Sequence, residues 1–427
     1  MPGFSHALYN LLVWVAQPLL RRKLARRAVA EPGYAVAVPE RFGHYTQPAE
    51  ATRTFVWVHA VSLGESRAAA ILLKALREAL PGVRILLTHG TATGRAEGAK
   101  LLQPGDVQVW QPWDTPAAVQ AFLNHFKPRI GLLMETEVWP NLVLQSARAG
   151  VPLALVNARM SEKSLRSALR WASLMRPTYA ALRAVWAQTE ADAQRLRALD
   201  ASVQTVTGNL KFDAQPDAGQ VAQGRAWRAA LPSPVCLLAS SREGEEALWL
   251  QALQKTQPQG VHWLIVPRHP QRVAEVQALL QGAGLSVSCR SRWGDAGPVQ
   301  QTHAQVWLGD SLGEMALYYS LADVALLGGS FEPLGGQNLI EAAACACPVV
   351  MGPHTFNFLE VAQHAELAGA AQRVPDMVSA VQQAQQLAQD PLARPKRAAD
   401  ALAFSQAHKG AARRVAGLVK ELLGSQG

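Results

Sequence analysis

Short apolar runs alternate with helix-like segments along most of the chain. In the first half, such runs begin at Thr54, Val83, Pro128, Val151 and Ala184. Their length and their β-branched residues are typical of buried strands. Amphipathic segments separate them, for example from about Glu65 to Leu80. This alternation predicts a parallel sheet with helices on both faces.

The same pattern returns in the second half after an interruption. The stretch from Thr207 to Gln220 concentrates Gly, Asn, Asp and Pro, which is typical of a connection. Later apolar runs begin at Pro234, Val261, Ala304, Ala322 and Cys347. We therefore predict an α/β protein with two doubly wound domains, in which ligands bind at the carboxyl ends of the strands.

The predicted boundaries follow from this alternation. A first domain covers residues 31–208, a hinge covers 209–217, and a second domain covers 218–427. Packing of the final helix back on the first domain is compatible with this division.

Residues 1–30 have a different pattern. Residues 7–20 are mostly apolar, and a basic cluster follows at residues 21–27. A secretory signal has its positive charge before the apolar run, so the order here is reversed. The order suits a membrane anchor facing the cytoplasm, with the cations on anionic headgroups. A soluble amphipathic helix is the alternative interpretation.

The net charge indicates what kind of partner the protein binds, and the cysteine content indicates in which cellular compartment it works. The 427 residues include 41 Lys and Arg against 32 Asp and Glu, which gives a formal charge of +9. Such an excess favours an anionic partner, namely a nucleic acid, a membrane surface or a phosphorylated substrate, although an ordinary basic enzyme has a similar charge. Cys236, Cys289, Cys345 and Cys347 fit neither a disulfide framework nor a zinc site, which indicates the cytosol.

The tetrapeptide Ser-Leu-Gly-Glu occurs twice, at 62–65 and at 311–314, each time between an apolar run and a helix-like segment. Ser-x-x-Glu is the capping-box pattern, so both copies are expected to cap helices. A glycine such as Gly64 or Gly313 also allows close approach to the backbone, and helix N-terminal amides bind anions. Spacing alone leaves both roles open for Glu65 and Glu314.

Further junctions between strands and helices carry polar residues. Thr88 and Thr91 lie in a hydroxyl-rich turn that could hold a phosphate but is not a Walker motif. Glu135 and Glu137 follow another strand. These residues are candidates for a site in the first domain.

The second domain offers a comparable set. Arg242 lies beside a turn, and Arg268, His269 and Arg272 form a basic trio that suits a phosphate or carboxylate. A plain surface loop explains the trio equally well. The segment GGQNLIE presents Asn338 and Glu341 to a sugar or nucleoside hydroxyl.

Taken in order, these motifs resemble the Kdo transferases of Gram-negative bacteria, where Kdo is 3-deoxy-D-manno-octulosonic acid. The resemblance rests on HAVSLGE, THGTATG, METEVWPN, NARMSEKS, GNLKFD, SSREGEE, PRHPQR, GDSLGEM, GGSFEPLGGQN and MGPHTFNF, which span nearly the whole chain. It implies a GT-B glycosyltransferase fold and transfer of Kdo from CMP-Kdo to a lipid A precursor. It also implies inversion at the anomeric carbon, no metal or other cofactor, no nucleic-acid partner, and a location on the cytoplasmic side of the inner membrane.

The resemblance implies roles for individual residues. Glu65 matches the family's catalytic base. The acceptor side is expected to use Ser62, Gly64, Thr88, Thr91 and Glu135. The donor side is expected to use Arg242, Arg268, His269, Gly313, Glu314, Asn338 and Glu341. The chain has Gln337 where the family usually has His, so no proton transfer is assigned to this position.

Two other classes of function remain as alternatives. A GT-B transferase or epimerase that acts on a UDP-sugar would have the same two domains. A solute-binding protein would also have two lobes around a hinge, but such proteins are exported, and the N-terminus lacks an ordinary signal. Turnover of CMP-Kdo separates these possibilities.

Overall fold

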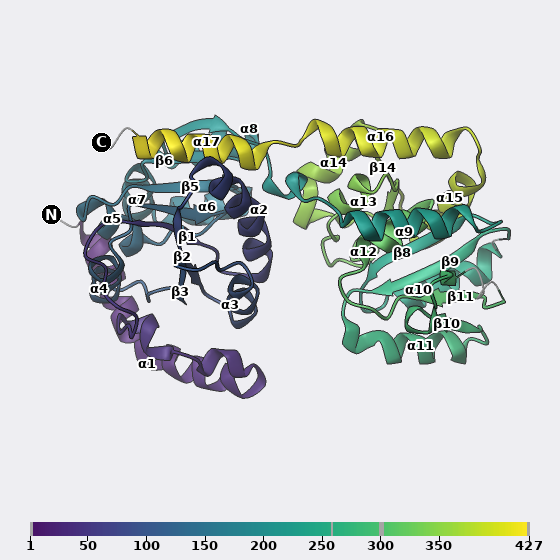
Figure 1. Ribbon diagram of the computed structural model, residues 1–427, viewed down its shortest axis with the longest axis horizontal. Helices are drawn as coiled ribbons and strands as arrows, with labels where there is room; N and C mark the ends of the chain where they lie inside the picture. The colour runs from purple at the N-terminus through teal and green to yellow at the C-terminus, as the bar shows by residue number, and fades with distance from the viewer. Residues whose placement is uncertain (1–2, 258, 299–302, 425–427) are drawn as a thin grey trace. The chain divides into compact units, whose positions relative to one another are not determined.

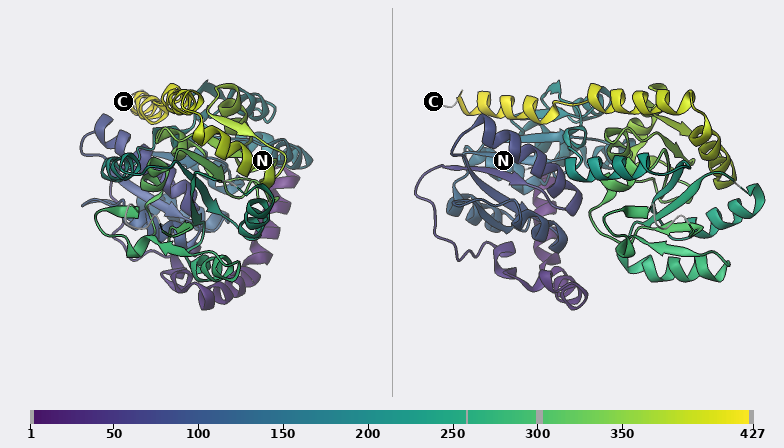
Figure 2. Two further views of the ribbon diagram at one scale, coloured as in Figure 1. Left: turned by 90° about the vertical axis from the view of Figure 1, so that its right-hand side faces the viewer. Right: turned by 45° about the vertical axis from the view of Figure 1, so that its right-hand side comes forward.

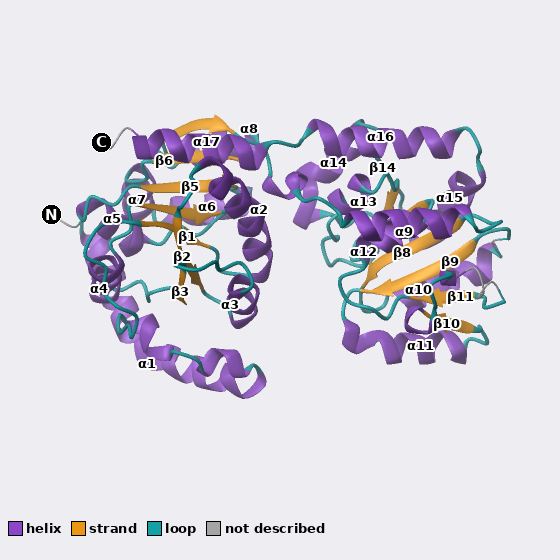
Figure 3. Ribbon diagram, in the orientation of Figure 1, coloured by secondary structure: helices purple, strands orange, loops and turns teal. Residues whose placement is uncertain are grey.

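The computed structural model describes residues 3–257, 259–298 and 303–424. The chain forms two compact units, of which unit 1 comprises Met1–Asp213 with Lys409–Gly427, and unit 2 comprises Ala214–His408. Each unit contains one parallel seven-stranded sheet with helices around it (Figure 1). Figure 3 separates these helices from the strands by colour. The predicted α/β class is confirmed.

The sheet of unit 1 has the strand order β3-β2-β1-β4-β5-β6-β7. Its strands are β1 (Phe55–His59), β2 (Arg84–His89), β3 (Val107–Trp110), β4 (Ile130–Met134), β5 (Leu153–Ala158), β6 (Ala184–Ala187) and β7 (Val203–Val206). The order reverses between β1 and β4, which pair directly with each other. A doubly wound sheet opens a crevice for ligands at such a reversal, beyond the carboxyl ends of the strands.

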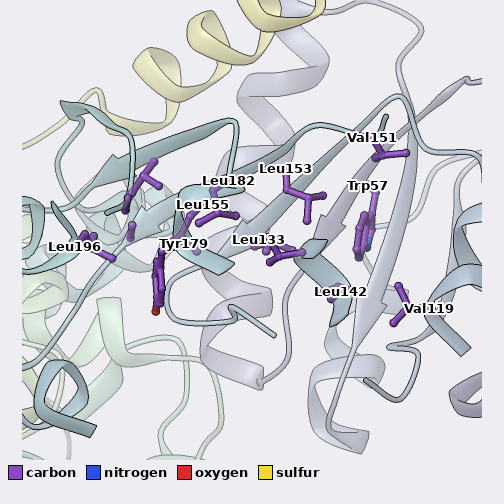
Figure 4. Close-up of a cluster of buried hydrophobic side chains, with 14 of the residues drawn as sticks. Trp57, Val119, Leu133, Leu142, Val151, Leu153, Leu155, Tyr179, Leu182 and Leu196 are labelled. Carbon is purple, nitrogen blue, oxygen red and sulfur yellow. The ribbon is translucent and has the colours of Figure 1, made fainter. Parts of the chain in front are cut away.

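Helices cover both faces of this sheet. They are α1 (Phe4–Ala30), α2 (Leu63–Ala79), α3 (Ala92–Ala99), α4 (Pro116–Phe126), α5 (Pro140–Arg148), α6 (Glu162–Arg170), α7 (Ala172–Ala180), α8 (Glu190–Arg197) and α17 (Ala411–Gly424). Trp57 and Leu142 belong to a buried cluster on the face covered by α4, α5 and α7 (Figure 4). Leu72 and Val419 belong to the cluster on the other face, where α2 and α17 pack.

Unit 2 repeats the architecture with the order β10-β11-β9-β8-β12-β13-β14. Its strands are β8 (Val235–Ser241), β9 (His262–Pro267), β10 (Val287–Cys289), β11 (Val306–Leu308), β12 (Val324–Leu327), β13 (Val349–Met351) and β14 (Ala371–Arg373). Its helices are α9 (Ala218–Ala229), α10 (Glu245–Thr256), α11 (Val273–Gly282), α12 (Met315–Leu321), α13 (Ile340–Ala344), α14 (Leu359–Leu367), α15 (Met377–Gln389) and α16 (Ala393–Ala407). Figure 2 shows the ribbon from two further directions.

The last helix, α17, is part of unit 1 although unit 2 precedes it in the chain. Val415, Val419 and Leu423 are buried in the cluster that α2 also lines. The carboxylate of Asp213 accepts a hydrogen bond from the Ala412 N–H at 2.6 Å. Apolar burial and an N-terminal carboxylate thus both fix α17 on the first sheet.

Helix α1 is attached to unit 1 through its first turns. The Tyr9 hydroxyl donates to Asp114 at 2.7 Å, and the Asn141 amide donates to Asn10 at 2.8 Å. His6 Nε2 lies 2.9 Å from Asn141 Oδ1. In the three described ranges we find no helix whose length and hydropathy would suit a bilayer-crossing segment.

Candidate active site

Glu65 lies in the first turn of α2, directly after the carboxyl end of β1. Its N–H donates to Ser62 Oγ at 3.3 Å, so Ser62 caps the helix. Its carboxylate accepts from the Val61 N–H at 2.8 Å and from the Ser62 hydroxyl at 2.9 Å. A Cβ on Gly64 would have its nearest neighbour 4.0 Å away, so the space above this helix end is open. The first tetrapeptide therefore forms the expected capping box and fixes the carboxylate beside open space.

The surroundings of Glu65 make it a stronger base than an ordinary carboxylate. Burial and then the negative charge of Glu137 raise the pKa of Glu65 to about 7, although hydrogen bonds from Val61 and Ser62 lower it. Glu137 is close because β4, which precedes it, pairs with β1. A carboxyl group with a pKa near the working pH is well suited to accept a proton.

Two glutamates follow β4 and have different partners. Glu135 is buried, has a left-handed backbone with φ 55, and pairs with Arg159 at 2.9 Å and Lys211 at 3.7 Å. Glu137 accepts from Trp139 Nε1 at 2.8 Å, and burial raises its pKa. Glu135 is thus paired with two cations, and both glutamates help to raise the pKa of Glu65, with Glu137 contributing more than Glu135. Among the described residues, no group of three or more His, Cys, Asp or Glu is placed to hold a metal ion.

The two threonines expected on the acceptor side differ in accessibility. Thr88 is fully buried, and its Oγ1 accepts from Trp57 Nε1 at 2.8 Å and lies 2.7 Å from His59 Nδ1. Its hydroxyl is used inside the sheet, so we withdraw it from the acceptor contacts. Thr91 is half-buried, caps α3, and donates to the Val61 carbonyl at 3.0 Å. Thr91 therefore ties its turn to the residue that binds Glu65.

In unit 2, the buried carboxylate of Glu245 joins two of the expected donor loops. It accepts from the Arg242 N–H at 2.8 Å, from the Gly329 N–H at 2.7 Å and from the Phe331 N–H at 3.1 Å. The Arg242 side chain itself pairs with Glu243 at 2.9 Å. Glu245 thus fixes the end of β8 to the loop after β12, next to the strand-order reversal.

The three basic residues after β9 do not act as one group. Arg268 and His269 are exposed, and Arg268 Nε donates to Gln337 Oε1 at 3.1 Å. Arg272 instead forms two hydrogen bonds with buried Glu246, at 2.9 and 3.0 Å. Arg272 therefore does not belong to an exposed basic group with Arg268 and His269, because its charge is used within the fold.

The second tetrapeptide does not form a capping box. Helix α12 begins at Met315, and its N-cap is Glu314 rather than Ser311. Gly313 has φ 80, a left-handed conformation that interrupts any helical turn before it. The Glu314 carboxylate pairs with Arg290 at 3.1 Å and also accepts from the Ser311 hydroxyl. The prediction that both copies cap helices is wrong for this copy.

Arg290 is itself held by aromatic rings. Its guanidinium lies 5.1 Å from the ring centre of Trp227 and 5.8 Å from that of Trp293. Cation–π contact and the ion pair with Glu314 together fix the loop after β11.

The glycine-rich turn before α13 brings three polar side chains to one loop. The pair Gly335–Gly336 has φ values of 91 and 76, which glycine adopts without strain. Gln337 accepts from Arg268, and Asn338 accepts from a backbone N–H in the first turn of α13 at 3.1 Å. Glu341 is half-buried in that turn. Gln337 thus accepts a charge-assisted hydrogen bond from the guanidinium of Arg268.

Sequence reasoning did not single out Glu245, Glu137 and Arg290 for the roles they have here. Glu245 carries no distinctive signal, because it is one of three glutamates within four residues after Arg242. The effect of Glu137 on Glu65 follows only from the pairing of β1 with β4. Arg290 carries no local signal, since its partner is 24 residues away.

Comparison with known proteins gives one consistent family. Residues 37–214 match the model described as 3-deoxy-D-manno-octulosonic-acid transferase (kdotransferase). A 3-deoxy-D-manno-octulosonic acid transferase of Bordetella pertussis is 46% identical over 433 residues, covering 98% of this chain and 100% of that one.

Solved structures share the architecture at low identity. A glycosyltransferase of Rickettsia africae ESF-5 is 12% identical with a TM-score of 0.58, covering 88% of this chain and 99% of that chain. A UDP-GlcNAc 2-epimerase of Neisseria meningitidis is 17% identical with a TM-score of 0.55, covering 86% and 99%. The fold is thus common to transferases and epimerases and does not distinguish between them.

Proposed function

Because this chain belongs to the family of 3-deoxy-D-manno-octulosonic-acid transferases, we propose that it transfers Kdo from CMP-Kdo to a lipid A precursor. It is a glycosyltransferase of lipopolysaccharide synthesis, with the two Rossmann-like units of the GT-B fold. The UDP-sugar alternative rests on fold likeness at 17% identity, against 46% for a Kdo transferase over almost the whole chain. Neither that alternative nor a solute-binding protein is favoured.

The single observation that carries the mechanism is the state of Glu65. A hydroxyl of the acceptor must lose its proton while it attacks the anomeric carbon of Kdo. Glu65 has a fixed orientation, a neighbouring Gly64 that leaves the end of the helix open, and a pKa raised to about 7 by burial and by Glu137. We assign Glu65 as the general base, a role typically worth ~100- to 10,000-fold in rate. Attack from the side opposite the leaving CMP inverts the anomeric centre.

The donor side is assigned to the strand ends of unit 2. CMP leaves as a phosphate monoester, so the growing charge needs cations or backbone amides rather than an acid. We assign this role to the exposed Arg268 and His269, beside Asn338 and Glu341; Arg268 is oriented by its hydrogen bond to Gln337. Glu245 supports these loops from within the fold.

The direct test is an assay of the purified full-length protein. We expect release of CMP from CMP-Kdo that depends on a lipid A precursor, with the product heavier by Kdo. UDP-N-acetylglucosamine in the same assay should be neither transferred nor epimerised. Turnover of the UDP-sugar in place of CMP-Kdo would contradict the proposed function.

The donor assignment has a separate test. Arg268→Ala should weaken CMP binding by about tenfold in calorimetry without acceptor, because a guanidinium contact to phosphate is charge-assisted. Arg272→Lys is the matched control, since Arg272 is bound to Glu246. Unchanged CMP affinity of Arg268→Ala would remove Arg268 from the site.

We also propose that α1 holds the enzyme at the cytoplasmic face of the inner membrane. Its exposed apolar side chains include Leu11, Leu12, Trp14, Val15 and Leu19. A groove of about 550 Å³ on the same helix is lined mainly by basic residues, among them Arg22, Lys23 and Arg26. Apolar residues followed by cations suit the boundary between acyl chains and anionic headgroups.

The contacts of the first turns of α1 determine which variant can test the proposed membrane location. Deletion of residues 1–30 would also remove the hydrogen bonds of His6 and Tyr9 to the fold. Substitution of Leu11, Trp14 and Val15 by Ser leaves those contacts in place. We expect the variant to sediment less with vesicles and to keep its activity on a detergent-dispersed acceptor. Unchanged sedimentation on neutral and anionic vesicles would rule out α1 as the anchor.

A further inference from the structure

Helix α6 carries a row of cations on the side that faces away from the core. Leu165 and Ala168 on this helix pack against the buried cluster of unit 1. Lys163, Arg166 and Arg170, three and four residues apart, lie on the opposite side of the helix and are exposed. In the part of the chain that the structure describes, none of these three cations, here called the basic row, forms an ion pair.

The composition around the basic row is apolar rather than acidic. Leu169 is 39% exposed and Trp171, directly after α6, is 48% exposed. The acid of α6, Glu162, already pairs with Arg195 at 2.7 Å. Unpaired cations beside an exposed indole and a leucine are typical of a helix that lies at a membrane interface.

The basic row adjoins the beginning of α1. Ser173 in the first turn of α7 is hydrogen-bonded to Ser5 of α1 at 2.6 Å. His6 binds Asn141 of α5, on the same face of the sheet as α6 and α7. Helices α2 and α17 cover the other face. The first turn of α1 and helix α6 therefore lie on the same face of unit 1, and α1 continues from there with its exposed apolar and basic side chains.

We propose that the basic row and Trp171 form a second contact of unit 1 with an anionic bilayer, next to α1. This inference rests on the proposed membrane location. Cations near an anionic membrane surface strengthen binding by about fivefold each, and tryptophan favours the headgroup level. Two contacts restrict the rotation of unit 1 on the membrane surface, whereas a single helix would leave the unit free to rotate about it.

The first test removes the charge of the basic row in the full-length protein. Lys163→Gln, Arg166→Gln and Arg170→Gln are combined, and sedimentation is measured with vesicles of phosphatidylcholine, with or without phosphatidylglycerol. We expect affinity for the anionic vesicles to fall by on the order of 100-fold, with little change on neutral vesicles. A loss below about threefold on anionic vesicles would overturn the inference.

A matched control removes the same charge from the other face of the sheet. Lys74→Gln on α2 with Arg413→Gln and Lys420→Gln on α17 changes three exposed cations. We expect a loss below about threefold, because these positions face away from the proposed contact. An equal loss in both triple variants would indicate a net-charge effect and overturn the inference.

The acceptor is also an anion, so a second readout separates it from the bilayer. The KM for a detergent-dispersed lipid A precursor should stay within about threefold in the basic-row variant. A large rise in KM with unchanged vesicle binding would assign the row to acceptor phosphates instead, and so overturn the bilayer contact. If the unmodified protein does not bind anionic vesicles, both this inference and the proposed membrane location are wrong. The proposed transferase activity would not be affected by that result.

A local probe avoids dependence on charge. Ser167 is exposed on the outward side of α6, and the four native cysteines are buried. A nitroxide on Ser167→Cys should become protected from a water-soluble relaxing agent when anionic vesicles are added. A nitroxide on Arg413→Cys should stay accessible. Equal accessibility at both positions would overturn the inference.

Discussion

The two Ser-Leu-Gly-Glu stretches have the same residues and different structures. In unit 1, Ser62 caps α2 and Glu65 lies in its first turn. In unit 2, Ser311 lies in the loop before α12 and does not cap it, and Glu314 is itself the N-cap residue. The same local pattern therefore starts a helix in one unit and ends a loop in the other.

The partner of the glutamate accounts for the difference. Glu65 is bound by a hydroxyl and a backbone N–H of its own turn. Glu314 is bound by Arg290, whose position two aromatic rings support. A helix cap contributes about 1 kcal/mol, which is small enough for tertiary contacts to override. The comparison also separates two roles, because Glu314 is held in an ion pair with a cation, whereas the hydrogen-bond partners of Glu65 come from its own turn.

Substitution of each glutamate by glutamine is expected to give the largest difference between the two stretches, measured as turnover. Glu65→Gln should lower turnover by at least ~100-fold, because the amide cannot accept a proton. Glu314→Gln should keep turnover at saturating CMP-Kdo within about threefold, since Glu314 is already paired with Arg290. Steady-state kinetics on a detergent-dispersed acceptor measures both. Near-normal turnover of Glu65→Gln would leave it only the capping role.

A double-mutant cycle tests the ion pair that distinguishes the second stretch. Arg290→Gln and Glu314→Gln are made singly and together, and urea unfolding is followed for each. We expect a coupling free energy of about 1 kcal/mol, because both side chains are mostly buried. No coupling would show that Gly313 alone decides the loop. The corresponding pair of Ser62→Ala and Glu65→Gln compares the capping box by the same measure.

The dependence of stability on pH sharpens the comparison further. The pKa of Glu65 is raised to about 7 in the fold by burial and by Glu137. The folded state then binds more protons than the unfolded state between about pH 4.5 and 7, so stability falls as pH rises through this range. Glu65→Gln lacks this loss. Its Tm relative to the parent should therefore increase from pH 5 to pH 8 in calorimetry, and a constant or opposite difference would contradict the raised pKa.

The smallest expected effect concerns the two serines. Ser62→Ala should speed amide exchange in the first turn of α2 by about fivefold, because the N-cap is lost. Ser311→Ala should leave exchange in the first turn of α12 unchanged, since Ser311 does not cap it. Hydrogen exchange with mass spectrometry resolves both segments. Equal responses in α2 and α12 would mean that the two stretches act alike in solution.

Hydrophobic patterning found the central strands of both sheets and missed the edges. The runs at Thr54 and Pro128 became β1 and β4, and those at Pro234 and Ala322 became β8 and β12. The strands without a predicted run are β3, β7, β10 and β14, which are the outer strands of the two sheets. An edge strand is short and pairs on one side only, so its sequence needs no continuous apolar run.

For the site residues, the success of the prediction depended on whether the hydrogen-bond partner was close or distant in the sequence. The cap of Ser62 was predicted from its spacing, because its partner lies three residues away; the cap of Thr91 has the same spacing but was not predicted. The internal contacts of Thr88 and Arg272 could not be read from the sequence, because their partners Trp57 and Glu246 are 31 and 26 residues away. In the sequence, a polar residue at the end of a strand has the same appearance whether its side chain binds a ligand or another residue of the protein.

The return of α17 to unit 1 has a consequence for the order of synthesis. Residues of unit 2 are contiguous, so this unit has its whole core once His408 has emerged from the ribosome. The first sheet emerges earlier but lacks Val415, Val419 and Leu423, which close one of its faces. Until then, the part of α2 and of the sheet that α17 covers is exposed. The unit that is translated first is therefore the last to be complete, and a nascent chain stalled before Lys409 should offer a chaperone that exposed face.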